Sequence, residues 1–312
     1  MPLPFEGSGK RFFPYFWYLR QTYGGRIAKV PLDGGFTCPN RDGSKGVGGC
    51  CYCSAAGSGD FIAAPHASLR EQYDAYRAQR LGKWQPVGYI PYFQSFTGTY
   101  APPERLRALY AQACALPDAV GLAIATRPDC VDESVCAVLA EFAARTDVTV
   151  ELGVQTIWDD TAARCGMCHT FADLEDAMSR LRHLPVSVCI HLINGLPGET
   201  AEQMVQSART VGGMGIHAVK LHALHVVRGT PLAGQPYRCL SREQYVSIVC
   251  DQLEVLPPHV VIQRLTGDGK GADLIAPAWS RGKRAVLAAI DRELARRGSV
   301  QGCRLARGTG RT

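Results

Sequence analysis

The chain has 312 residues, a net charge of +6 and a hydrophobic content of 46%. This is enough for one large domain or one and a half, with a normal globular core. No apolar run reaches the ~20 residues of a membrane helix, and residues 1–10 lack the apolar stretch of a secretory signal. We therefore expect a cytoplasmic protein without a membrane partner, whose thirteen cysteines are thiols or metal ligands.

The first segment, residues 1–24, is rich in aromatic side chains, above all at 12–18. We predict a short helix that packs on the core, because core packing is the commoner use of such a cluster. Stacking on nucleic-acid bases is the alternative.

A cysteine- and glycine-rich stretch follows, from Cys38 to Cys53. Glycine and proline disfavour a helix or strand there, so we predict a loop that folds back on itself. Cys50 and Cys53 form a C-x2-C pair, and Cys38 supplies a third thiolate. A structural zinc ion needs four closed ligands, and the fourth would have to be Cys51 or His66. Three thiolates on a four-iron cluster leave one iron open for a ligand that is not protein. A disulfide staple is the remaining alternative.

Beyond this loop, β-rich segments alternate with amphipathic helices. Pro103 opens one helix, and Thr170, Thr200 and Ser241 are predicted to cap others. Such alternation predicts a parallel sheet with right-handed crossovers. The six predicted strands are 27–32, 87–94, 119–126, 147–155, 185–193 and 216–226.

Four of these strands have one apolar face and one small or polar face, because successive side chains point to opposite sides. A closed eight-stranded barrel has an apolar interior, so a polar interior indicates a wider, partly open barrel that holds a ligand. Burying charged groups without a function would be costly. A structural ion pair between Glu151 and Lys220 is the alternative. The polar residues on this face include Glu151, Gln155, His191, Lys220 and His222.

The alternation fades from about residue 236. We therefore divide the chain into a core, 1–235, with the cysteine loop at 33–60, and a C-terminal extension, 236–312. Residues 281–312 hold nine Lys or Arg and two acidic residues. This is compatible with nucleic-acid binding and equally with a solvated helix face and a disordered tail. The segments expected in the extension are a helix at 241–254, a β-rich segment at 260–264, a glycine turn at 267–271 and a basic helix at 281–297.

The cysteine loop resembles that of the radical S-adenosylmethionine (SAM) superfamily. The matching sequence motifs are F-T-C-P-N-R-D-G at 36–43 and G-C-x-x-C at 49–53. Within the superfamily, the chain is most similar to the YhcC/YtqA-like group, which is related to the radical-SAM half of the Elongator catalytic subunit. The resemblance continues at 125–129, 151–156, 191–200 and 264–268.

The resemblance implies an α/β fold, namely a partial (β/α)6 TIM-like barrel with a small C-terminal α+β extension. It also implies a [4Fe–4S] cluster on Cys38, Cys50 and Cys53, whose open iron binds SAM. A reduced cluster then cleaves SAM to methionine and a 5′-deoxyadenosyl radical, with the electron coming from a donor such as flavodoxin or ferredoxin.

Further site residues are carried over from the family by position. Gln94 and Ser95 match the region that meets the SAM amino group, and Gln155 and His191 match positions near its ribose and carboxylate. Arg127 is placed to pair with a carboxylate of SAM or of the substrate. The remaining candidates are Tyr52, which precedes the last cysteine, as a cofactor-binding residue, and Glu151, Lys220 and His222 as catalytic residues.

One departure from the family pattern concerns residues 167–169, Met-Cys-His, where members commonly have Arg-Gly-His. Either Arg164 or Arg127 replaces the missing arginine at the SAM carboxylate, or SAM binding is weaker than in other members. Cys165 and Cys168 form a second C-x2-C pair. Two free thiols are preferred over a second metal site, because no third ligand is visible.

The Elongator-like resemblance and the basic C-terminus favour an enzyme of tRNA wobble-uridine modification. The expected phosphate contacts are Arg292, Arg296 and Arg297 on the basic helix. A small-molecule substrate is one alternative. A cluster-binding protein without turnover is another, although a scaffold needs no polar barrel interior.

Overall fold

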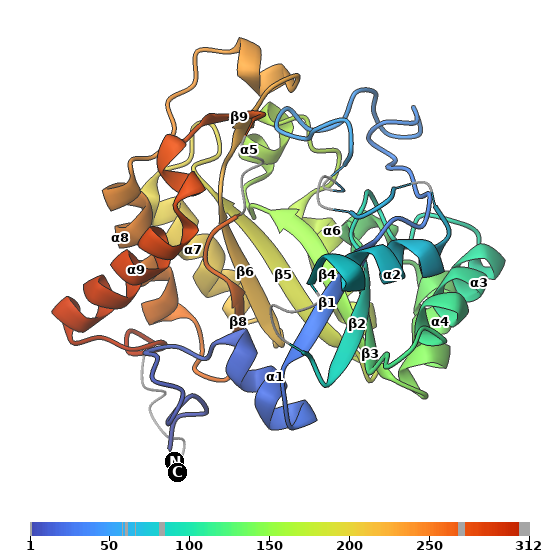
Figure 1. Ribbon diagram of the computed structural model, residues 1–312. Helices are drawn as coiled ribbons and strands as arrows, with labels where there is room; N and C mark the ends of the chain where they lie inside the picture. Colours follow the sequence, from blue (N-terminus) through green and yellow to red (C-terminus); the bar gives the residue numbers. More distant parts are fainter. Residues whose placement is uncertain are drawn as a thin grey trace.

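A curved, seven-stranded parallel sheet forms the centre of the protein (Figure 1). The computed structural model describes residues 2–57, 59, 62–65, 67–80, 85–267 and 272–305. The spatial order is β1-β2-β3-β4-β5-β6-β8, so each new strand of this sheet is added beside the previous one. These strands are β1 (Ile27–Leu32), β2 (Gly88–Phe93), β3 (Gly121–Thr126), β4 (Asp147–Gln155), β5 (Ser187–Asn194), β6 (Ala218–Ala223) and β8 (Val261–Arg264).

Helices cover the outside of this half barrel, while α1 (Tyr15–Tyr23) lies across the lower end of its concave side (Figure 1). A separate antiparallel pair, β7 (Val226–Val227) and β9 (Leu274–Ala276), lies at the upper end. The other helices are α2 (Leu69–Arg80), α3 (Pro103–Cys114), α4 (Glu133–Ala143), α5 (Asp159–Arg164), α6 (Phe171–Leu181), α7 (Ala201–Gly212), α8 (Arg242–Val255) and α9 (Lys283–Arg297), with 3-10 turns η1 (Pro128–Cys130), η2 (Pro231–Gly234) and η3 (Ala278–Arg281).

The six predicted strands and the α/β partial barrel are confirmed. The sheet also has a seventh strand, because β8 pairs in parallel with β6 instead of standing apart in an extension. At four residues, β8 is too short for an alternating pattern to reveal its place. The boundary at residue 235 stays a prediction. His66, Asp268, most of the glycine turn and the tail after residue 305 lie outside the described residues.

The helix starts follow the predicted capping chemistry. The hydroxyl groups of Thr170, Thr200 and Ser241 each accept a hydrogen bond from the backbone N–H three residues on. In all three helices the third residue returns a bond to the cap, which completes a capping box. These caps satisfy backbone donors that the first turn of a helix leaves free.

The hydrophobic core lies between the outer face of the sheet and the helices. Val150, Leu152 and Ile190 are fully buried there, as the alternation predicts. On the opposite face Glu151 and Lys220 are also buried, with exposed fractions of 2% and 6%. Apolar packing thus holds the helices outside, and charged groups remain on the inside of the half barrel.

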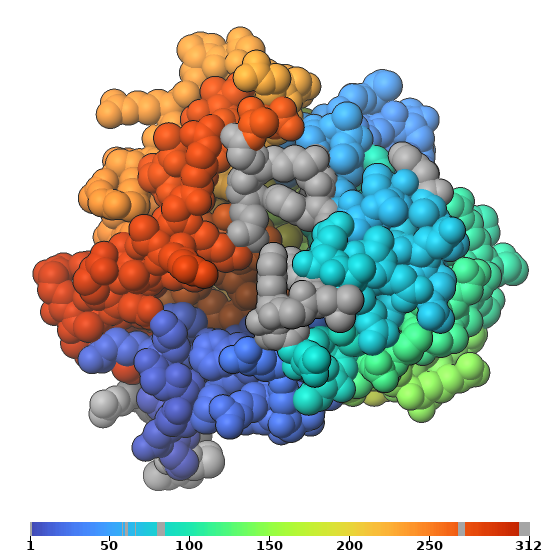
Figure 2. Space-filling view, viewed as in Figure 1, coloured from blue at the N-terminus to red at the C-terminus, as the bar shows by residue number. Residues whose placement is uncertain are grey.

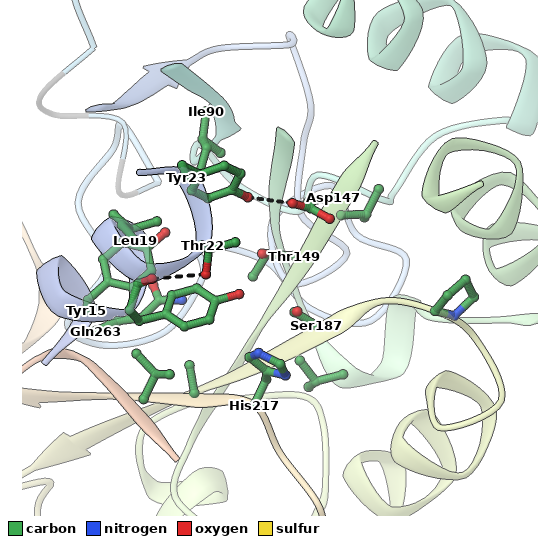
Figure 3. A pocket seen from close by; sticks show the side chains of 16 residues that line it. Tyr15, Leu19, Thr22, Tyr23, Ile90, Asp147, Thr149, Ser187, His217 and Gln263 are labelled. Atoms are coloured by element: carbon green, nitrogen blue, oxygen red, sulfur yellow. Dashed lines mark hydrogen bonds between the residues drawn. The ribbon is translucent and has the colours of Figure 1, made fainter. Parts of the chain in front are cut away.

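The floor of the half barrel is formed by α1, at the N-terminal ends of the strands. Tyr15, Tyr18 and Tyr23 of this helix line a cavity of about 110 Å³ against β4 and β5 (Figure 3). The Tyr23 hydroxyl donates to Asp147 of β4 over 2.7 Å. The aromatic segment therefore forms a helix on the core, as predicted.

The C-terminal residues return to the floor and pack on the N-terminal segment. The backbone N–H of Gln301 donates to the Arg11 carbonyl over 2.8 Å, and Lys10 pairs with Asp291 of α9. Figure 2 shows this junction where red residues meet blue ones at the lower edge. None of the helices in the described residues is long and apolar enough to span a membrane.

Candidate active site

The carboxyl ends of the parallel strands meet at the upper edge of the sheet, which we call the mouth (Figure 1). The loop that carries Cys38, Cys50 and Cys53 follows β1 and lies at this edge. In α/β sheets of this kind, ligands bind outside the carboxyl ends of the strands. The mouth and the concave face below it, the lumen, are therefore the candidate active site.

Asn40 anchors the cysteine loop from the inside. Its Nδ2 donates to Cys50 Sγ at 3.4 Å and to the Gly166 carbonyl at 2.6 Å, while its Oδ1 accepts from Cys168 Sγ at 2.7 Å. Only 2% of Asn40 is exposed. Sequence reasoning did not single out this residue. Its position could have indicated a role, because Asn40 lies two residues after Cys38 in the segment 36–43 that resembles the family.

A buried ion pair lies beside Cys38. The Arg127 guanidinium donates two bonds of 2.8 Å to the Asp129 carboxylate, and its Nη1 lies 3.8 Å from Cys38 Sγ. Burial opposes the charge of Arg127, but Asp129 outweighs it and raises the Arg127 pKa. We expected Arg127 to pair with a carboxylate of SAM or substrate; in this structure its carboxylate partner is Asp129. Its third nitrogen, Nη1, points to Cys38 of the cluster loop.

The three thiols fit the predicted four-iron cluster. Asn40 donates to Cys50, Arg127 approaches Cys38, and the Cys53 N–H bonds the Cys50 carbonyl over 2.9 Å. A guanidinium and an amide donor aimed at sulfur stabilise thiolate ligands. In the described part of the chain, no three His, Cys, Asp or Glu side chains are grouped to hold a metal ion. An iron–sulfur cluster does not need its three cysteines to meet at one point, because each thiolate binds a different iron.

The second C-x2-C pair does not act as a pair. Cys168 donates to Asn40, whereas Cys165 lies against Cys51 and accepts its backbone N–H at the carbonyl oxygen. Arg164, a candidate for the missing arginine, donates to the Pro197 carbonyl over 3.2 Å. These three residues thus hold the cysteine loop and the loop after β5 in place.

A three-residue ion network crosses the lumen. The carboxylate of Glu151 on β4 accepts from Lys220 on β6 and from Lys29 on β1. Lys220 also lies 3.4 Å from the Tyr92 hydroxyl, and Lys29 lies 4.3 Å from the centre of the Tyr92 ring. The ion pair between Glu151 and Lys220 is therefore present. Lys29 was missed, although the alternation in β1 places it on the same face as Ile27.

Two lysines share one carboxylate in this network, and the pKa values of Glu151 and Lys220 reflect it. Burial alone would raise the pKa of Glu151, but Lys220 and Lys29 together hold it well below its usual range. Burial lowers the pKa of Lys220 to about 8, and Glu151 offsets this only in part because Lys29 is also close. Glu151 is therefore ionised at neutral pH, and Lys220 is the group that titrates near it.

Two histidines stand in the lumen beside this network. The rings of His191 on β5 and His222 on β6 are 4.6 Å apart, edge to face. The Nε2 atom of each is buried and has no hydrogen-bond partner among the described residues. Burial, and then the nearby Lys220 for His191 and His191 for His222, keeps both pKa values well below the usual range. Both are neutral imidazoles with a ring nitrogen left for a ligand.

The other predicted cofactor-binding residues lie around the mouth. Gln155 ends β4 with a φ of +69°, a left-handed conformation that is strained for a residue other than glycine. Gln94 and Ser95 follow β2, and Ser95 is buried with 3% exposed. Tyr52 packs with the apolar cluster beside the cysteine loop. The structure brings Glu151, Lys220, His191 and His222 together, and the roles of all predicted site residues stay predictions.

Comparison with known proteins decides the family. Residues 38–211 match the radical SAM superfamily, and residues 216–296 match the Radical_SAM C-terminal domain. The chain belongs to the radical SAM superfamily. Radical SAM enzymes use a [4Fe–4S] cluster and SAM and need a reductant, so this chain is an enzyme with these two cofactors.

Two similar bacterial proteins match almost the whole chain. It is 43% identical to the uncharacterized protein YtqA of Bacillus subtilis over 96% of this chain and 95% of YtqA. It is 36% identical to protein YhcC of Escherichia coli K12 over 93% and 94% of the two chains. The recognition of the YhcC/YtqA-like group is thereby confirmed.

More distant similarities extend to Elongator-like proteins. The structure of the archaeal Methanocaldococcus infernus Elp3 aligns with a TM-score of 0.64 and 17% identity, over 88% of this chain and 64% of that one. A tRNA uridine(34) acetyltransferase of Methanocaldococcus jannaschii is 30% identical over 48% of this chain and 28% of its own length. The first similarity confirms the fold of this radical SAM enzyme.

We predict that Cys38, Cys50 and Cys53 each hold one iron of the cluster. Replacing any of them by Ala should abolish the oxygen-sensitive cluster after anaerobic reconstitution, measured by absorbance and by iron per chain. Cys51→Ala is the matched control and should keep the cluster, because the Cys51 thiol faces Cys165. A variant of Cys51 that loses the cluster while a variant of Cys50 keeps it would contradict the assignment.

The shared carboxylate predicts a shift in the titration of Lys220. Lys29→Met removes a neighbouring positive charge and leaves Glu151 to Lys220 alone, so the Lys220 pKa should rise from about 8 toward the ordinary lysine value of about 10.4. Lys220 would then stay charged over a wider pH range. The measurement is the ¹³Cε shift of Lys220 against pH in lysine-labelled protein. Lys45→Met, which removes a lysine bonded to Asp129, should leave the titration unchanged, and a lower pKa in Lys29→Met would refute the network.

Proposed function

We propose that this radical SAM enzyme modifies a uridine base of tRNA and takes its electron from a cytoplasmic flavodoxin or ferredoxin. The observation that carries the proposal is the pair of buried, unpartnered imidazoles of His191 and His222 below the mouth. Such nitrogens are costly to bury without a ligand. The similarity to a tRNA uridine(34) acetyltransferase supports the substrate class.

The chain's part is to hold and orient the cofactors and the base. Cys38, Cys50 and Cys53 would hold the cluster, which when bound supplies one electron to cleave SAM to methionine and a 5′-deoxyadenosyl radical. Arg127 and Asn40 would neutralise and orient its thiolates. We assign Gln155, Gln94, Ser95 and Tyr52 to the SAM side of the mouth, where strand ends and loops exclude water.

The lumen offers several hydrogen-bond donors, which suit a base with several carbonyl oxygens. Lys29 and Lys220 outnumber Glu151 by one positive charge, and neutral imidazoles at His191 and His222 can each donate one N–H. Uracil offers two carbonyl oxygens and one N–H in one plane, and a base must leave its stack to reach a buried site. A small carboxylate or carbonyl compound is the alternative that such a lumen could also bind.

The structure changes which arginines are expected to meet RNA. Arg297 pairs with Glu293, Asp251 and Glu254 and is therefore part of the packing of α9 on α8. Arg292 and Arg296 lie near the same end of α9, which contacts the N-terminal segment at the floor. The predicted contacts of this basic end would thus be far from the mouth. Exposed arginines on the loops after β6, Arg228 and Arg238, lie on the mouth side instead.

The decisive test of the function is turnover that depends on tRNA. Reduced, reconstituted protein with SAM should release 5′-deoxyadenosine slowly, and tRNA from a deletion strain should increase the rate at least severalfold. His222→Ala should keep the cluster and lose the tRNA-dependent part, because one base contact is gone. Mass spectrometry of nucleosides from the same tRNA identifies the product. Release of 5′-deoxyadenosine that total tRNA does not change would leave the small-molecule alternative.

The revised RNA surface predicts a difference between two matched double variants. Each phosphate contact contributes about 0.7–0.9 to the slope of log K against log salt. Replacing Arg228 and Arg238 by Ala should therefore reduce the slope for tRNA by roughly 1.5. Replacing Arg292 and Arg296 removes the same charge at the floor and should leave the slope unchanged. Anisotropy titrations at several salt concentrations measure both, and the reverse pattern would restore α9 as the RNA surface.

A further inference from the structure

Three cysteines outside the cluster set gather beneath the cysteine loop. Cys51, Cys165 and Cys239 belong to one apolar cluster with Leu196 and Leu232. None of them is needed for the three-thiolate cluster. Cys165 is fully buried, whereas Cys51 is half-buried. Three thiols that are not cluster ligands therefore lie close to the cysteines expected to hold the oxygen-sensitive [4Fe–4S] cluster.

Two of these cysteines lie side by side although they come from different segments. The backbone N–H of Cys51 donates to the Cys165 carbonyl over 2.9 Å, and both residues belong to the same apolar cluster. With standard backbone bond lengths, one N–H···O=C bond of 2.9 Å keeps the two Cα atoms within about 6.8 Å of each other. Disulfides span Cα distances of 4.4–6.8 Å. Cys51 and Cys165 therefore lie within reach of a direct bond.

Neighbouring thiols have other contacts. Cys168 donates to Asn40 over 2.7 Å, on the other side of the turn that follows α5. Cys50 accepts from the same Asn40 and belongs to the cluster set. Cys239 comes from the loop after η2 and packs in the same apolar cluster. The geometry thus singles out one pair.

We propose that Cys51 and Cys165 are a redox-active thiol pair that closes to a disulfide. A small disulfide such as oxidised glutathione is the oxidant. The half-buried Cys51 attacks one of its sulfurs and releases one glutathione; Cys165 then displaces the second glutathione from the mixed disulfide. Two protein thiols are oxidised to one Sγ–Sγ bond, and one glutathione disulfide is reduced to two thiols that carry the two protons.

The bond would fasten the cluster loop to the end of α5. Cys51 stands between the ligands Cys50 and Cys53 in the sequence, so its thiol would become a competing cluster ligand if it turned away from Cys165. Joined to Cys165, it is held away from the cluster, and the open iron stays available to SAM. The proposal uses the cluster ligand set and is independent of the tRNA substrate, so either can fail alone.

The test maps disulfides in the cluster-loaded protein. Reconstituted enzyme is treated anaerobically with oxidised glutathione, free thiols are alkylated after denaturation, and peptides are read by mass spectrometry. The expected result is a Cys51–Cys165 cross-linked peptide, a loss of two free thiols per chain and an unchanged cluster absorbance before denaturation. Cys239→Ser, the matched control, should give the same cross-link and the same loss.

Variants of the pair separate the proposal from a nonspecific reaction. Cys165→Ser should stop at a glutathione adduct on Cys51, and Cys51→Ser should leave Cys165 unmodified, because only Cys51 is accessible. Both should keep the cluster. A Cys51–Cys239 or Cys50–Cys53 cross-link as the main product, no cross-link at all, or a cluster absorbance that falls in step with the cross-link would each overturn the proposal.

Discussion

The carboxylate of Glu151, shared by Lys29 and Lys220, is the constraint on which this half barrel depends. It joins β1, β4 and β6 across the concave face, although these strands are not neighbours in the sheet. Buried ions are stable only when they are paired, so replacing Glu151 would leave two ammonium groups without a counter-charge, whereas replacing one lysine would leave a balanced pair. An interior held by ions is not closed by apolar packing, and its polar groups can bind a ligand.

The two ends of the lumen have opposite characters. At the floor, aromatic residues of α1 cover the N-terminal ends of the strands, with Tyr15 close to both Lys29 and Glu151. At the mouth, a loop carries the cysteines, the strained Gln155 ends β4, and the histidine pair lies just below on β5 and β6. Aromatic packing of α1 thus closes the floor, where no ligand is expected. The unpartnered nitrogens of His191 and His222 lie near the mouth, where ligands are expected to bind.

One loop combines several kinds of cysteine chemistry. Asn40 and Arg127 aim N–H groups at two of the cluster sulfurs, while Cys51 is bonded to Cys165 on the opposite side. Adjacent residues along an extended loop point apart. The same backbone therefore presents Cys50 to iron and Cys51 to Cys165 at the end of α5. The departure from the usual Arg-Gly-His pattern supplies a different thiol, Cys168, which donates to Asn40.

The sequence by itself determined the strands, the capped helices and the polar face of the lumen, because these patterns depend on residues within one turn or one strand. The two sequence motifs of the cysteine loop, at 36–43 and 49–53, indicated the family, which the comparisons confirm. Only the tertiary structure decided that Lys29 shares Glu151, that Arg127 bonds Asp129, that β8 joins the sheet and that the basic end of α9 lies at the floor. These facts depend on sheet curvature and on how distant segments dock, and no local pattern encodes either.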